Sequence, residues 1–439
     1  MNIYLHVEVK TRDLPGRILL GMNAAKQGHD VYLGDQELLE LVSKKKLNPG
    51  IILEKSITPT KNRVQLLKNL KKTKSIITSI DEEGGLLLEN IETFLSERMS
   101  KKTLKLINNN FFWGNYDFRY AKKIFKEFKK KFVVTGNPRV ELWNKRYKRT
   151  ISNNLGVKNY VLISSNFKVG LSAKRFSEIY KFHLENSLFN KKKYRNFFNN
   201  HFAYTFNILL NFVFLINFLT QKMPNINFVV RPHPSESESN WKNFLIPSKN
   251  LIISKKYSHS DWIENSSVVL HNGCTGGVEA FKRNKNVICF RPFNSKYEIN
   301  FPNQFSLICK NENEVYKQIK KIYEKRKIIK KPSKKMKAFY VKRFNDGEKE
   351  SFCKNIVNIW NSYDNNYLSK TNNLNRVKLK GLVRNYKSKI MNQPENFKFP
   401  SLKKNELSNL INGIKLCNPE LKNVQFDIIN QRLLRLKLI

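Results

Sequence analysis

The sequence contains little cysteine, and no arrangement of it that would organise a fold. Five cysteines are spread over 439 residues, and none forms a CxxC pair or stands at the spacing of Cys/His metal ligands. Reduced thiols, as in the cytoplasm, are therefore expected. The first residues, MNIYLHVEVKTRD, also lack the basic and apolar regions of a secretory signal. We expect a cytoplasmic protein.

Acidic residues are the second shortage. The chain has 35 Asp and Glu against 81 Lys and Arg, a formal charge of +46. Such an excess suits nucleic acid, anionic lipid or a phosphorylated substrate. The lysines, however, are spread along the whole chain together with many Asn and Ile, as a biased genome composition also produces. Because there is no basic stripe interleaved with aromatics and no zinc-finger or RNA-binding signature, nucleic acid is the least favoured of these partners.

Long apolar runs are also scarce. The strongest, FNILLNFVFLINFLT at residues 206–220, is short for a membrane span, which needs about 20 residues. It contains Asn207, Asn211 and Asn217, and their spacing puts at least two of them near one helix face. We therefore predict a helix packed in the core rather than a membrane span.

Two common nucleotide-binding motifs are missing. The Walker pattern is absent, and no GxGxxG follows the first strand expected in the amino-terminal half. Neither a kinase-type NTPase nor a standard dinucleotide enzyme is therefore supported.

Runs of β-forming residues alternate with helix-like segments through most of the chain. In the first 150 residues we predict strands at 2–9, 30–33, 50–53, 75–80 and 131–135, with helices at 14–26, 36–43 and 61–70. After a polar linker at 144–159, we predict strands at 160–164, 225–230, 251–253, 267–270 and 287–290, with a long helical region at 172–222. This alternation is typical of an α/β fold in which helices cover parallel sheets.

Two alternating series predict two Rossmann-like domains with a cleft between them. We expect them at residues 1–150 and 151–365, followed by a basic, helical appendage at 366–439. Ligands of open α/β sheets bind beyond the carboxyl ends of the strands. The residues that directly follow predicted strands are therefore the candidates for chemistry.

The strongest local signal is a glycine-rich turn after the strand at 267–270. It consists of His271, Asn272, Gly273, Cys274, Thr275, Gly276 and Gly277. Glycines let a backbone approach a ligand closely, and the free N–H groups at a helix start attract anions, so a diphosphate or nucleotide phosphate fits there. Glu279 is placed to accept hydrogen bonds from a ribose, although a glutamate in a first turn also compensates the helix dipole.

The second signal is RPHPSE, at residues 231–236, which also follows a strand. Two prolines restrict the backbone of Arg231 and His233 before any ligand arrives. Arg231 suits a bidentate contact with phosphate or carboxylate, and His233 suits a hydrogen bond or proton transfer to a phosphate or leaving group. The alternative is a rigid surface turn with a solvent-facing histidine.

The amino-terminal half contributes an acidic loop. SIDEEGG, at residues 79–85, puts Asp81, Glu82 and Glu83 directly after a strand. Like charges this close raise at least one pKa, which is one way to obtain a general acid or base near neutral pH. The alternative is a solvated acidic loop or a helix start.

Basic residues follow two other strands of this half. KTRDLPGR, at residues 10–17, brings Arg12, Asp13 and Arg17 towards the expected cleft from a loop and helix start. TGNPRVEL, at residues 135–142, places Arg139 at the head of a helix, where the alternative is a capped turn and hinge. We expect these four residues on the acceptor side of the cleft.

The order RDLPGR, DEEGG, FFWG, TGNPR, RPHPSE and GCTGGVEA resembles the family of bacterial surface carbohydrate biosynthesis proteins. It is similar, more distantly, to capsule polysaccharide transferases and teichoic acid glycerophosphotransferases, and the glycine-rich element resembles that of UDP-N-acetylglucosamine 2-epimerase. The resemblance covers roughly residues 1–365 and implies the two-domain GT-B architecture. The segment 181–200 and the tail after about residue 363 have no counterpart in it.

The resemblance also implies roles. The donor nucleotide would bind the carboxyl-terminal domain through Arg231, His233 and the glycine-rich turn with Glu279, and the acceptor would bind near the acidic loop. No metal or other cofactor is implied, and the sequence has no DxD after a strand to hold a divalent ion.

We therefore predict a glycosyltransferase that moves a sugar, or a similar phosphate-activated unit, from a nucleotide donor to a glycan or lipid-linked glycan. Asp81, Glu82, Glu83 and His233 are the candidate catalytic residues. The enzyme is expected in the cytoplasm, with peripheral contact to the inner face of an anionic membrane compatible with a lipid-linked acceptor. The alternatives are a sugar-nucleotide epimerase or hydrolase on the same fold, and a non-catalytic basic module that binds glycan or membrane.

Overall fold

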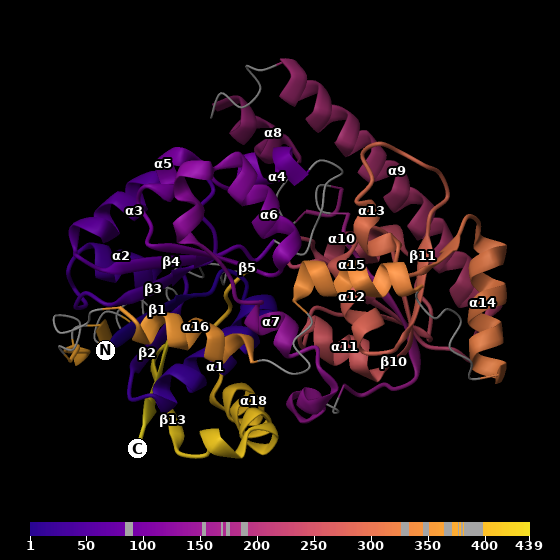
Figure 1. Cartoon of the computed structure of the whole chain (residues 1–439). Coiled ribbons are helices and arrows are strands. Elements are labelled where there is room, and N and C mark those ends of the chain that lie inside the picture. Colours follow the sequence, from indigo (N-terminus) through magenta and orange to yellow (C-terminus); the bar gives the residue numbers. More distant parts are fainter. Residues whose placement is uncertain are drawn as a thin grey trace. The chain divides into compact units, whose positions relative to one another are not determined.

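The chain folds into two compact units, which we describe separately. The computed structural model describes residues 1–83, 91–151, 155–167, 170–172, 176–185, 192–325, 333–345, 351–363, 371–375, 377–378, 381 and 398–439. Unit 1 comprises Met1–Ile151 and Lys337–Ile439, and unit 2 comprises Ser152–Met336. Figure 1 shows the elements of both.

Unit 1 is built on an eight-stranded sheet of order β13-β14-β2-β1-β3-β4-β5-β6. The six strands of the amino-terminal half pair in parallel. They are β1 (Asn2–His6), β2 (Asp30–Gly34), β3 (Ile51–Glu54), β4 (Ile76–Ile80), β5 (Asn109–Phe112) and β6 (Phe132–Val134). Because β1 lies between β2 and β3, the direction of the chain across the sheet reverses at β1.

Helices cover both faces of this sheet (Figure 1). They are α1 (Lys10–Lys26), α2 (Gln36–Ser43), α3 (Lys61–Lys72), α4 (Ile91–Arg98), α5 (Lys101–Leu104), α6 (Asn115–Ile124), α7 (Pro138–Glu141), α15 (Lys334–Phe344), α16 (Phe352–Asn361) and α18 (Lys404–Cys417), with short 3₁₀ turns η1 (Lys126–Lys131), η2 (Lys145–Thr150) and η4 (Pro419–Leu421). One core of the unit packs α2 and α3 against Tyr4, Ile52 and Ile77 of the strands.

The division at the carboxyl-terminal end differs from the one expected. Residues 366–439 are not a separate helical appendage, because β13 (Val424–Asn430) and β14 (Leu433–Leu438) form a hairpin that pairs antiparallel with β2. Leu434 and Leu436 of β14 are completely buried. The segment thus completes unit 1, and unit 2 ends near Met336 rather than at 365.

Unit 2 has a six-stranded parallel sheet of order β12-β11-β10-β7-β8-β9. The strands are β7 (Tyr160–Ser164), β8 (Phe228–Arg231), β9 (Leu251–Ile253), β10 (Ser266–His271), β11 (Asn286–Phe290) and β12 (Leu307–Cys309). The helices are α8 (Phe176–Glu185), α9 (Lys192–Lys222), α10 (Glu238–Phe244), α11 (His259–Asn265), α12 (Thr275–Lys282), α13 (Asn300–Asn303) and α14 (Glu312–Lys325).

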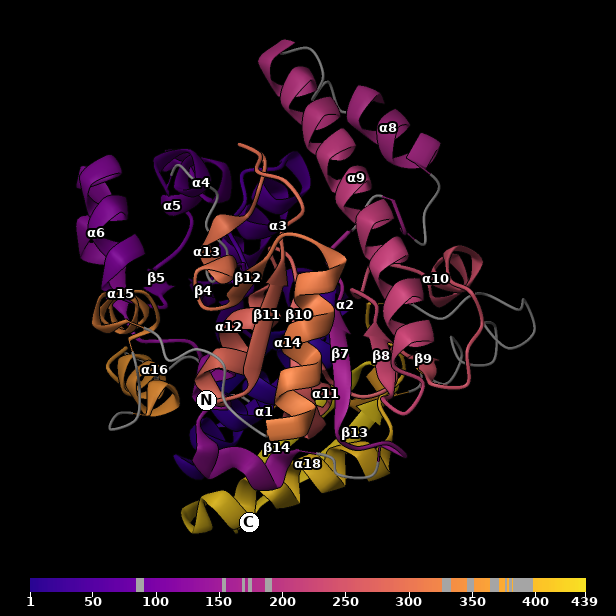
Figure 2. The ribbon, with the colours of Figure 1, turned by 90° about the vertical axis from the view of Figure 1, so that its right-hand side faces the viewer.

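The two faces of this sheet carry different helices. Val161 and Ile163 pack against α9 and α14, whereas Tyr160 and Leu162, which point to the other face, pack against α11 and α12. In this sheet the strand order reverses between β7 and β10. Figure 2 shows β7, β10 and α12 from the side of unit 2.

The apolar run at 206–220 forms the second half of α9, and its prediction as a core helix is confirmed. Ile208, Phe212 and Leu219 are among its buried side chains. The helix passes a length and composition test for a membrane span over Tyr194–Lys222, but such a test is also passed by core helices. Spanning a membrane would require this core contact to be lost.

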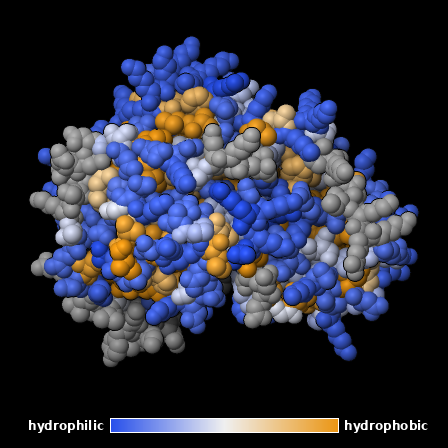
Figure 3. All heavy atoms as spheres, turned by 60° about the horizontal axis from the view of Figure 1, so that its bottom comes forward, coloured by the Kyte–Doolittle hydropathy of each residue, from blue (hydrophilic) through white to orange (hydrophobic). Residues whose placement is uncertain are grey.

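The face of the molecule shown in Figure 3 is predominantly hydrophilic. On the face shown in Figure 3, hydrophilic residues cover most of the area and hydrophobic residues form separate, small areas. This agrees with lysines that are spread along the chain. The expected α/β class with two Rossmann-like units is confirmed.

Candidate functional site

The candidate site of unit 2 lies where its strand order reverses, between β7 and β10. Ligands of open parallel sheets bind at this position, beyond the carboxyl ends of the strands. Ser164, the last residue of β7, pairs in register with His271 of β10 and with Arg231 of β8. Paired residues of parallel strands point to the same face. All three side chains therefore lie on the side covered by α11 and α12.

Ser164 joins the two helices of that side. Its hydroxyl is hydrogen-bonded to Nε2 of His259 at 2.9 Å and lies 3.1 Å from Sγ of Cys274. Cys274 is the N-cap of α12, and its sulfur accepts the N–H of Gly276 at 3.4 Å. Asn166, two residues after Ser164, donates to the carbonyl of Gly273 at 2.9 Å. Sequence reasoning did not single out Ser164, Asn166 or His259.

The glycines of the turn allow close packing. A Cβ on Gly276 would stand 2.1 Å from the ring of His259, and one on Gly277 would stand 2.3 Å from Nε2 of His271. Gly273 has a φ of +59°, which residues with side chains rarely adopt. The start of α12 therefore sits directly against the sheet, with its first N–H groups at the carboxyl ends of β7 and β10.

The other residues of this turn differ in burial and in their hydrogen-bond partners. His271 is completely buried beneath α12, where Nε2 is hydrogen-bonded to Ser306 at 2.7 Å, and burial lowers its pKa to about 3. Asn272 is also buried and donates to the carbonyl of Phe290 at 2.8 Å. Thr275, in the first turn of α12, is half-buried. His271 and Asn272 thus support the turn from below.

Arg231 is the buried cation of this site. Its side chain is 4% exposed, burial lowers its pKa to about 10, and Cys274 is among the groups that interact with its charge. One guanidinium nitrogen donates to the carbonyl of Pro232, whereas Nε has no hydrogen-bond partner among the described residues. A buried donor without a partner is costly, so it is a natural place for an anionic ligand.

The loop that carries His233 is held by Glu236. This carboxylate is completely buried and accepts from the N–H of Phe167 at 2.7 Å and from the N–H of His233 at 3.1 Å. It also accepts from Trp241 Nε1 at 3.0 Å and from the hydroxyl of Ser165. The RPHPSE turn is therefore fixed by a buried charge as well as by its prolines.

The same loop contacts the ring of His233. Nδ1 of His233 lies 2.7 Å from the hydroxyl of Ser235 and 3.2 Å from its N–H, and when Nδ1 accepts this N–H the neutral ring carries its proton on Nε2. The ring is half-buried. His233 can therefore donate a hydrogen bond through Nε2.

Glu279 has a partner within its own helix. It is buried and pairs with Arg283 at 3.0 Å, and Arg283 also pairs with Glu264 of α11 at 3.4 Å. The structure thus places Glu279 between α11 and α12. The ribose contact proposed for it remains a prediction.

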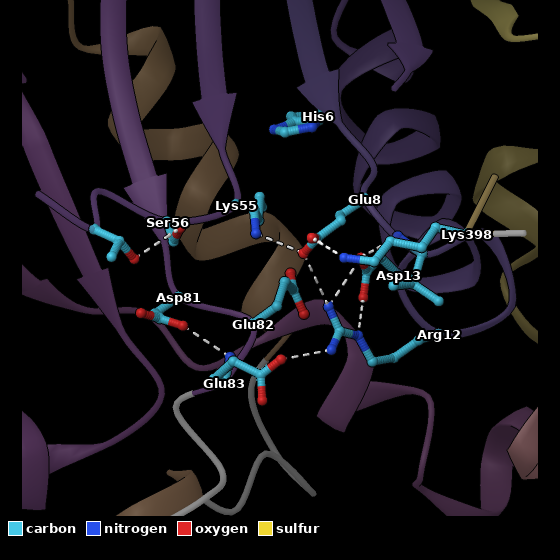
Figure 4. A network of polar contacts seen from close by, with 12 residues as sticks. His6, Glu8, Arg12, Asp13, Lys55, Ser56, Asp81, Glu82, Glu83 and Lys398 are labelled. Carbon is cyan, nitrogen blue, oxygen red and sulfur yellow. Dashed lines mark hydrogen bonds and ion pairs between the residues drawn. The ribbon is translucent and has the colours of Figure 1, made fainter. Parts of the chain in front are cut away.

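The acidic loop of unit 1 follows β4, and each of its three carboxylates contacts a different arginine. Asp81 pairs with Arg98 at 2.6 Å, and Glu83 pairs with Arg12 at 2.7 Å. Arg12 also contacts the neighbouring Asp13 at 2.5 Å. Figure 4 shows Asp81, Glu83, Arg12 and Asp13 converging beyond the carboxyl ends of the strands. The glycines at 84–85 lie outside the described residues.

Glu82 differs from its neighbours because it is buried. One carboxylate oxygen lies 2.9 Å from Arg17 of α1, and the other has no hydrogen-bond partner among the described residues. Burial raises the pKa of Glu82, and the negative charge of nearby Asp13 raises it further. The positive charges of the nearby arginines lower it, but the net change is upward. Its burial and raised pKa make Glu82 the candidate general base of the acidic loop.

Arg12, Asp13 and Arg17 lie on α1, which begins at Lys10 rather than at residue 14 as predicted. The physical reason is a cap that the pattern did not reveal, in which Asp13 accepts the N–H of Val9 at 2.9 Å. Arg139, at the start of α7, lies with its guanidinium over the rings of Trp113 and Trp143, at 5.5 and 5.7 Å. The structure thus brings together the predicted basic residues and the acidic loop of this unit.

A second charged group at this edge was missed by sequence reasoning. Glu8, just after β1, contacts Lys55 at 2.5 Å, Lys398 at 2.8 Å and Arg12 at 3.7 Å (Figure 4). Although burial acts in the opposite direction, Lys55 and Lys398 hold the pKa of Glu8 well below its usual range. Lys398 comes from the far end of the sequence, so its place was not predictable from local pattern.

His6 and Glu54 lie where the strand order of unit 1 reverses. His6 ends β1 and contacts Glu54, which ends β3, at 2.6 Å, and Glu54 also pairs with Arg63 at 2.6 Å. Burial opposes ionisation of Glu54, but His6 and Arg63 lower its pKa to about 2. Glu54 directly follows the predicted strand at 50–53, whereas His6 lies within the predicted strand at 2–9, so the local pattern did not single out the pair.

Among the described residues, no group of three or more His, Cys, Asp or Glu side chains is placed to hold a metal ion.

Comparisons with known proteins give matches in structure alone. No protein-family model and no curated protein sequence matches the chain. UDP-GlcNAc 2-epimerase from Neisseria meningitidis, bound to UDP-GlcNAc, is similar with 14% identity and a TM-score of 0.48, over 83% of this chain and 100% of that one. UDP-GlcNAc 2-epimerase from Methanocaldococcus jannaschii is similar with 13% identity and a TM-score of 0.48, over 83% of this chain and 100% of that one.

The wall teichoic acid polymerase TagF is also similar, with 11% identity and a TM-score of 0.49, over 82% of this chain and 88% of that one. The resemblance drawn from the motif order named both kinds of protein. The structures that are similar to this chain include both kinds of protein.

Proposed function

We propose that this chain is a GT-B glycosyltransferase of surface polysaccharide biosynthesis. It moves a sugar, or a similar phosphate-activated unit, from a nucleotide donor to a glycan. The observation that carries this proposal is Arg231, a buried cation whose Nε has no partner among the described residues, on the same sheet face as the start of α12. A nucleotide phosphate supplies the anion that this site lacks.

In the reaction, the bond between the sugar's anomeric carbon and the donor phosphate breaks, and a bond to the acceptor oxygen forms. Arg231, the N–H groups of Gly276 and Gly277, and Nε2–H of His233 stabilise the charge on the departing phosphate. Thr275 and Gly273 complete the turn around it. No divalent ion is needed for this step, because the cation and the helix amides provide the positive charge.

The acceptor hydroxyl loses its proton as it attacks. Glu82 takes that proton, since it is the carboxylate of the acidic loop with a raised pKa. Asp81 and Glu83 fix the loop through Arg98 and Arg12. Arg17 and Arg139 belong to the acceptor side of the same unit. The acceptor is a glycan or lipid-linked glycan, and the enzyme works in the cytoplasm at the inner face of the membrane.

The test uses purified full-length protein with CMP-, UDP-, GDP- and CDP-activated donors. Calorimetry should detect binding of at least one of them, and absence of binding to all four would contradict the proposal. Arg231→Gln should weaken binding by at least about tenfold. His233→Ala should lower turnover by about 10²-fold with little change in melting temperature. Glu82→Gln should lower turnover by about 10²–10⁴-fold and leave donor binding unchanged.

The alternative enzyme, a sugar-nucleotide epimerase or hydrolase, acts without an acceptor. Incubation with donor alone followed by product analysis separates the two, because an epimerised or free sugar then forms. A non-catalytic module predicts binding to glycan or vesicles that is sensitive to salt and survives Arg231→Gln and His233→Ala. In that case no donor is turned over by the wild-type protein.

A further inference from the structure

Helix α8 and the first half of α9 form an aromatic hairpin outside the core of unit 2. Between Lys192 and Asn207, none of the side chains whose exposure the structure describes is buried. Buried positions begin at Ile208, where α9 meets the sheet. Figures 1 and 2 both show α8 and the first half of α9 extending past the strands of their own unit.

The hairpin is held together by rings that contact one another. Phe176 of α8 stacks on Phe202 of α9, with centroids 4.4 Å apart. His183 lies 4.6 Å from Phe198, and Tyr180 lies 6.2 Å from the same ring. These contacts fix α8 against α9 without shielding the rings from solvent. The hairpin is therefore an ordered element that presents apolar side chains.

The most exposed apolar side chains of the hairpin are large. Phe182 and Leu184 on α8 are 56% and 55% exposed, and Phe197 on α9 is 42% exposed. Phe176 is 40% exposed even though it stacks on Phe202. Phe182 and Leu184 point to different sides of α8, but both lie near its end, beside the part of α9 that carries Phe197. A soluble monomer rarely exposes several large apolar side chains at one end of a hairpin, so this end fits a partner.

Exposed cations stand on the same two helices. Lys181 of α8 and Lys192 and Arg195 of α9 are exposed. Lys181 reaches Glu185 at 3.8 Å, an exposed contact that leaves its charge available to solvent. Exposed aromatic and leucine side chains mixed with Lys and Arg are typical of helices that lie in the interface of an anionic bilayer. The formal charge of +46 adds attraction to the same surface.

We propose that the α8–α9 hairpin docks on an anionic lipid bilayer, with Phe182, Leu184 and Phe197 at the level of the headgroups and Lys192 and Arg195 on the lipid phosphates. This rests on the proposed function, because it names the surface at which a lipid-linked acceptor is met. Docking leaves the core half of α9 in place, so the hairpin lies on the membrane and does not cross it.

A tryptophan reporter tests the depth of insertion. The native tryptophans are buried without exception: Trp113, Trp143, Trp241, Trp262 and Trp360. In Phe182→Trp, emission should shift to the blue and be quenched by phosphatidylglycerol vesicles with brominated acyl chains. The wild-type protein should show little quenching. An unquenched reporter on a protein that sediments with the vesicles would overturn the proposal, because charge alone would then account for binding.

Loss of the apolar side chains is the second test. Phe182→Ser combined with Leu184→Ser should weaken binding of the full chain to phosphatidylglycerol vesicles at 0.5 M salt by at least about tenfold. The matched control is Leu416→Ser, an equally exposed leucine on α18 of unit 1, which should leave binding unchanged. Equal binding of the double variant and wild type would contradict the proposal.

A second copy of the chain is the competing occupant of this surface. If sedimentation shows that the wild type self-associates without lipid and the double variant is monomeric, the hairpin is an interface between copies and the lipid proposal is wrong. Donor binding in solution, measured on the same variants, should be unchanged. A protein that binds vesicles through the hairpin but binds no nucleotide would instead contradict the proposed function alone.

Discussion

At the scale of single residues, Cys274 differs from the other cysteines. It is half-buried and caps α12, with the N–H of Gly276 directed at its sulfur. Burial raises the pKa values of Cys289, Cys309, Cys353 and Cys417. Because thiolates react and thiols do not, iodoacetamide should modify Cys274 first. Peptide mass spectrometry after brief labelling measures this.

The same labelling reports on the donor site. A bound nucleotide donor should protect Cys274, since Cys274 caps α12 and the proposed donor site lies at the start of the same helix, and Cys274→Ser should show little early labelling. Labelling that begins at Cys417, or that a bound donor does not slow, would contradict the placement of the donor.

His271 makes the folded protein sensitive to acid. Burial lowers its pKa from 6.5 to about 3 in the folded protein, so between these values the unfolded chain binds a proton that the folded protein does not. Above pH 6.5, His271 is neutral in both the folded and the unfolded state, so it does not reduce the free energy of unfolding. As the pH falls towards 3, it should decrease the free energy of unfolding by about 1.4 kcal/mol per pH unit.

Denaturant titrations at several pH values measure this slope. His271→Gln should flatten it between pH 6 and pH 4.5, above the range in which Glu54 adds its own loss of stability. Ser306→Ala removes the hydrogen bond to His271 but keeps the titrating ring, so it should lower stability and retain the slope. A slope that persists in His271→Gln would assign it to other groups.

At the scale of elements, one buried carboxylate fixes the loop after β8. Glu236→Gln places an amide N–H₂ among groups that are all donors, so it should destabilise unit 2 by about 1–3 kcal/mol. Because the loop carries His233 and follows Arg231, donor binding should weaken as well. Chemical denaturation and calorimetry measure the two effects. The control is Glu178→Gln on the exposed surface of α8, and a fully stable Glu236→Gln would contradict this role.

The element pattern was predictable where hydrophobic periodicity was strong. The strands at 160–164 and 251–253 and the helix at 36–43 have the predicted bounds, and β1, β2 and β3 lie within one to three residues of them. Strand β5 was missed because its sequence begins with two asparagines, which are poor strand formers. This segment forms a strand because it is buried between the neighbouring strands of the sheet, which the local sequence does not reveal.

The candidate site was predictable only in part. Three parts of the site were predictable because the local sequence places each of them directly after a strand. They are the turn at 271–277, Arg231 and the acidic loop. The partners of these residues come from distant segments, such as His259 beside Ser164 and Lys398 beside Glu8. Local pattern also does not separate a ligand contact from a supporting residue. His271, for example, stands in the turn but is completely buried.

At the scale of the whole molecule, the carboxyl-terminal hairpin is part of the first sheet. Leu436 of β14 is completely buried, and a Cβ on Gly21 of α1 would stand 2.8 Å from its methyl group. Leu436→Ala should therefore destabilise unit 1 by about 2–5 kcal/mol. Leu438→Ala, at the exposed end of the same strand, should cost far less. Hydrogen exchange resolved by segment should show the loss in unit 1 while the sheet of unit 2 keeps its protection.

The antiparallel pairing of β14 with β2 also imposes an order on biosynthesis. Strand β2 leaves the ribosome near residue 34 and its neighbour only near residue 433, an interval of roughly 20–80 s at typical elongation rates. During that time β2 pairs only with β1 and its other edge has no partner strand, and such edges promote aggregation. Unit 2, whose sequence is continuous, can fold before the unit that begins ahead of it. A nascent or prematurely terminated chain is therefore a client for chaperones that bind exposed strand edges.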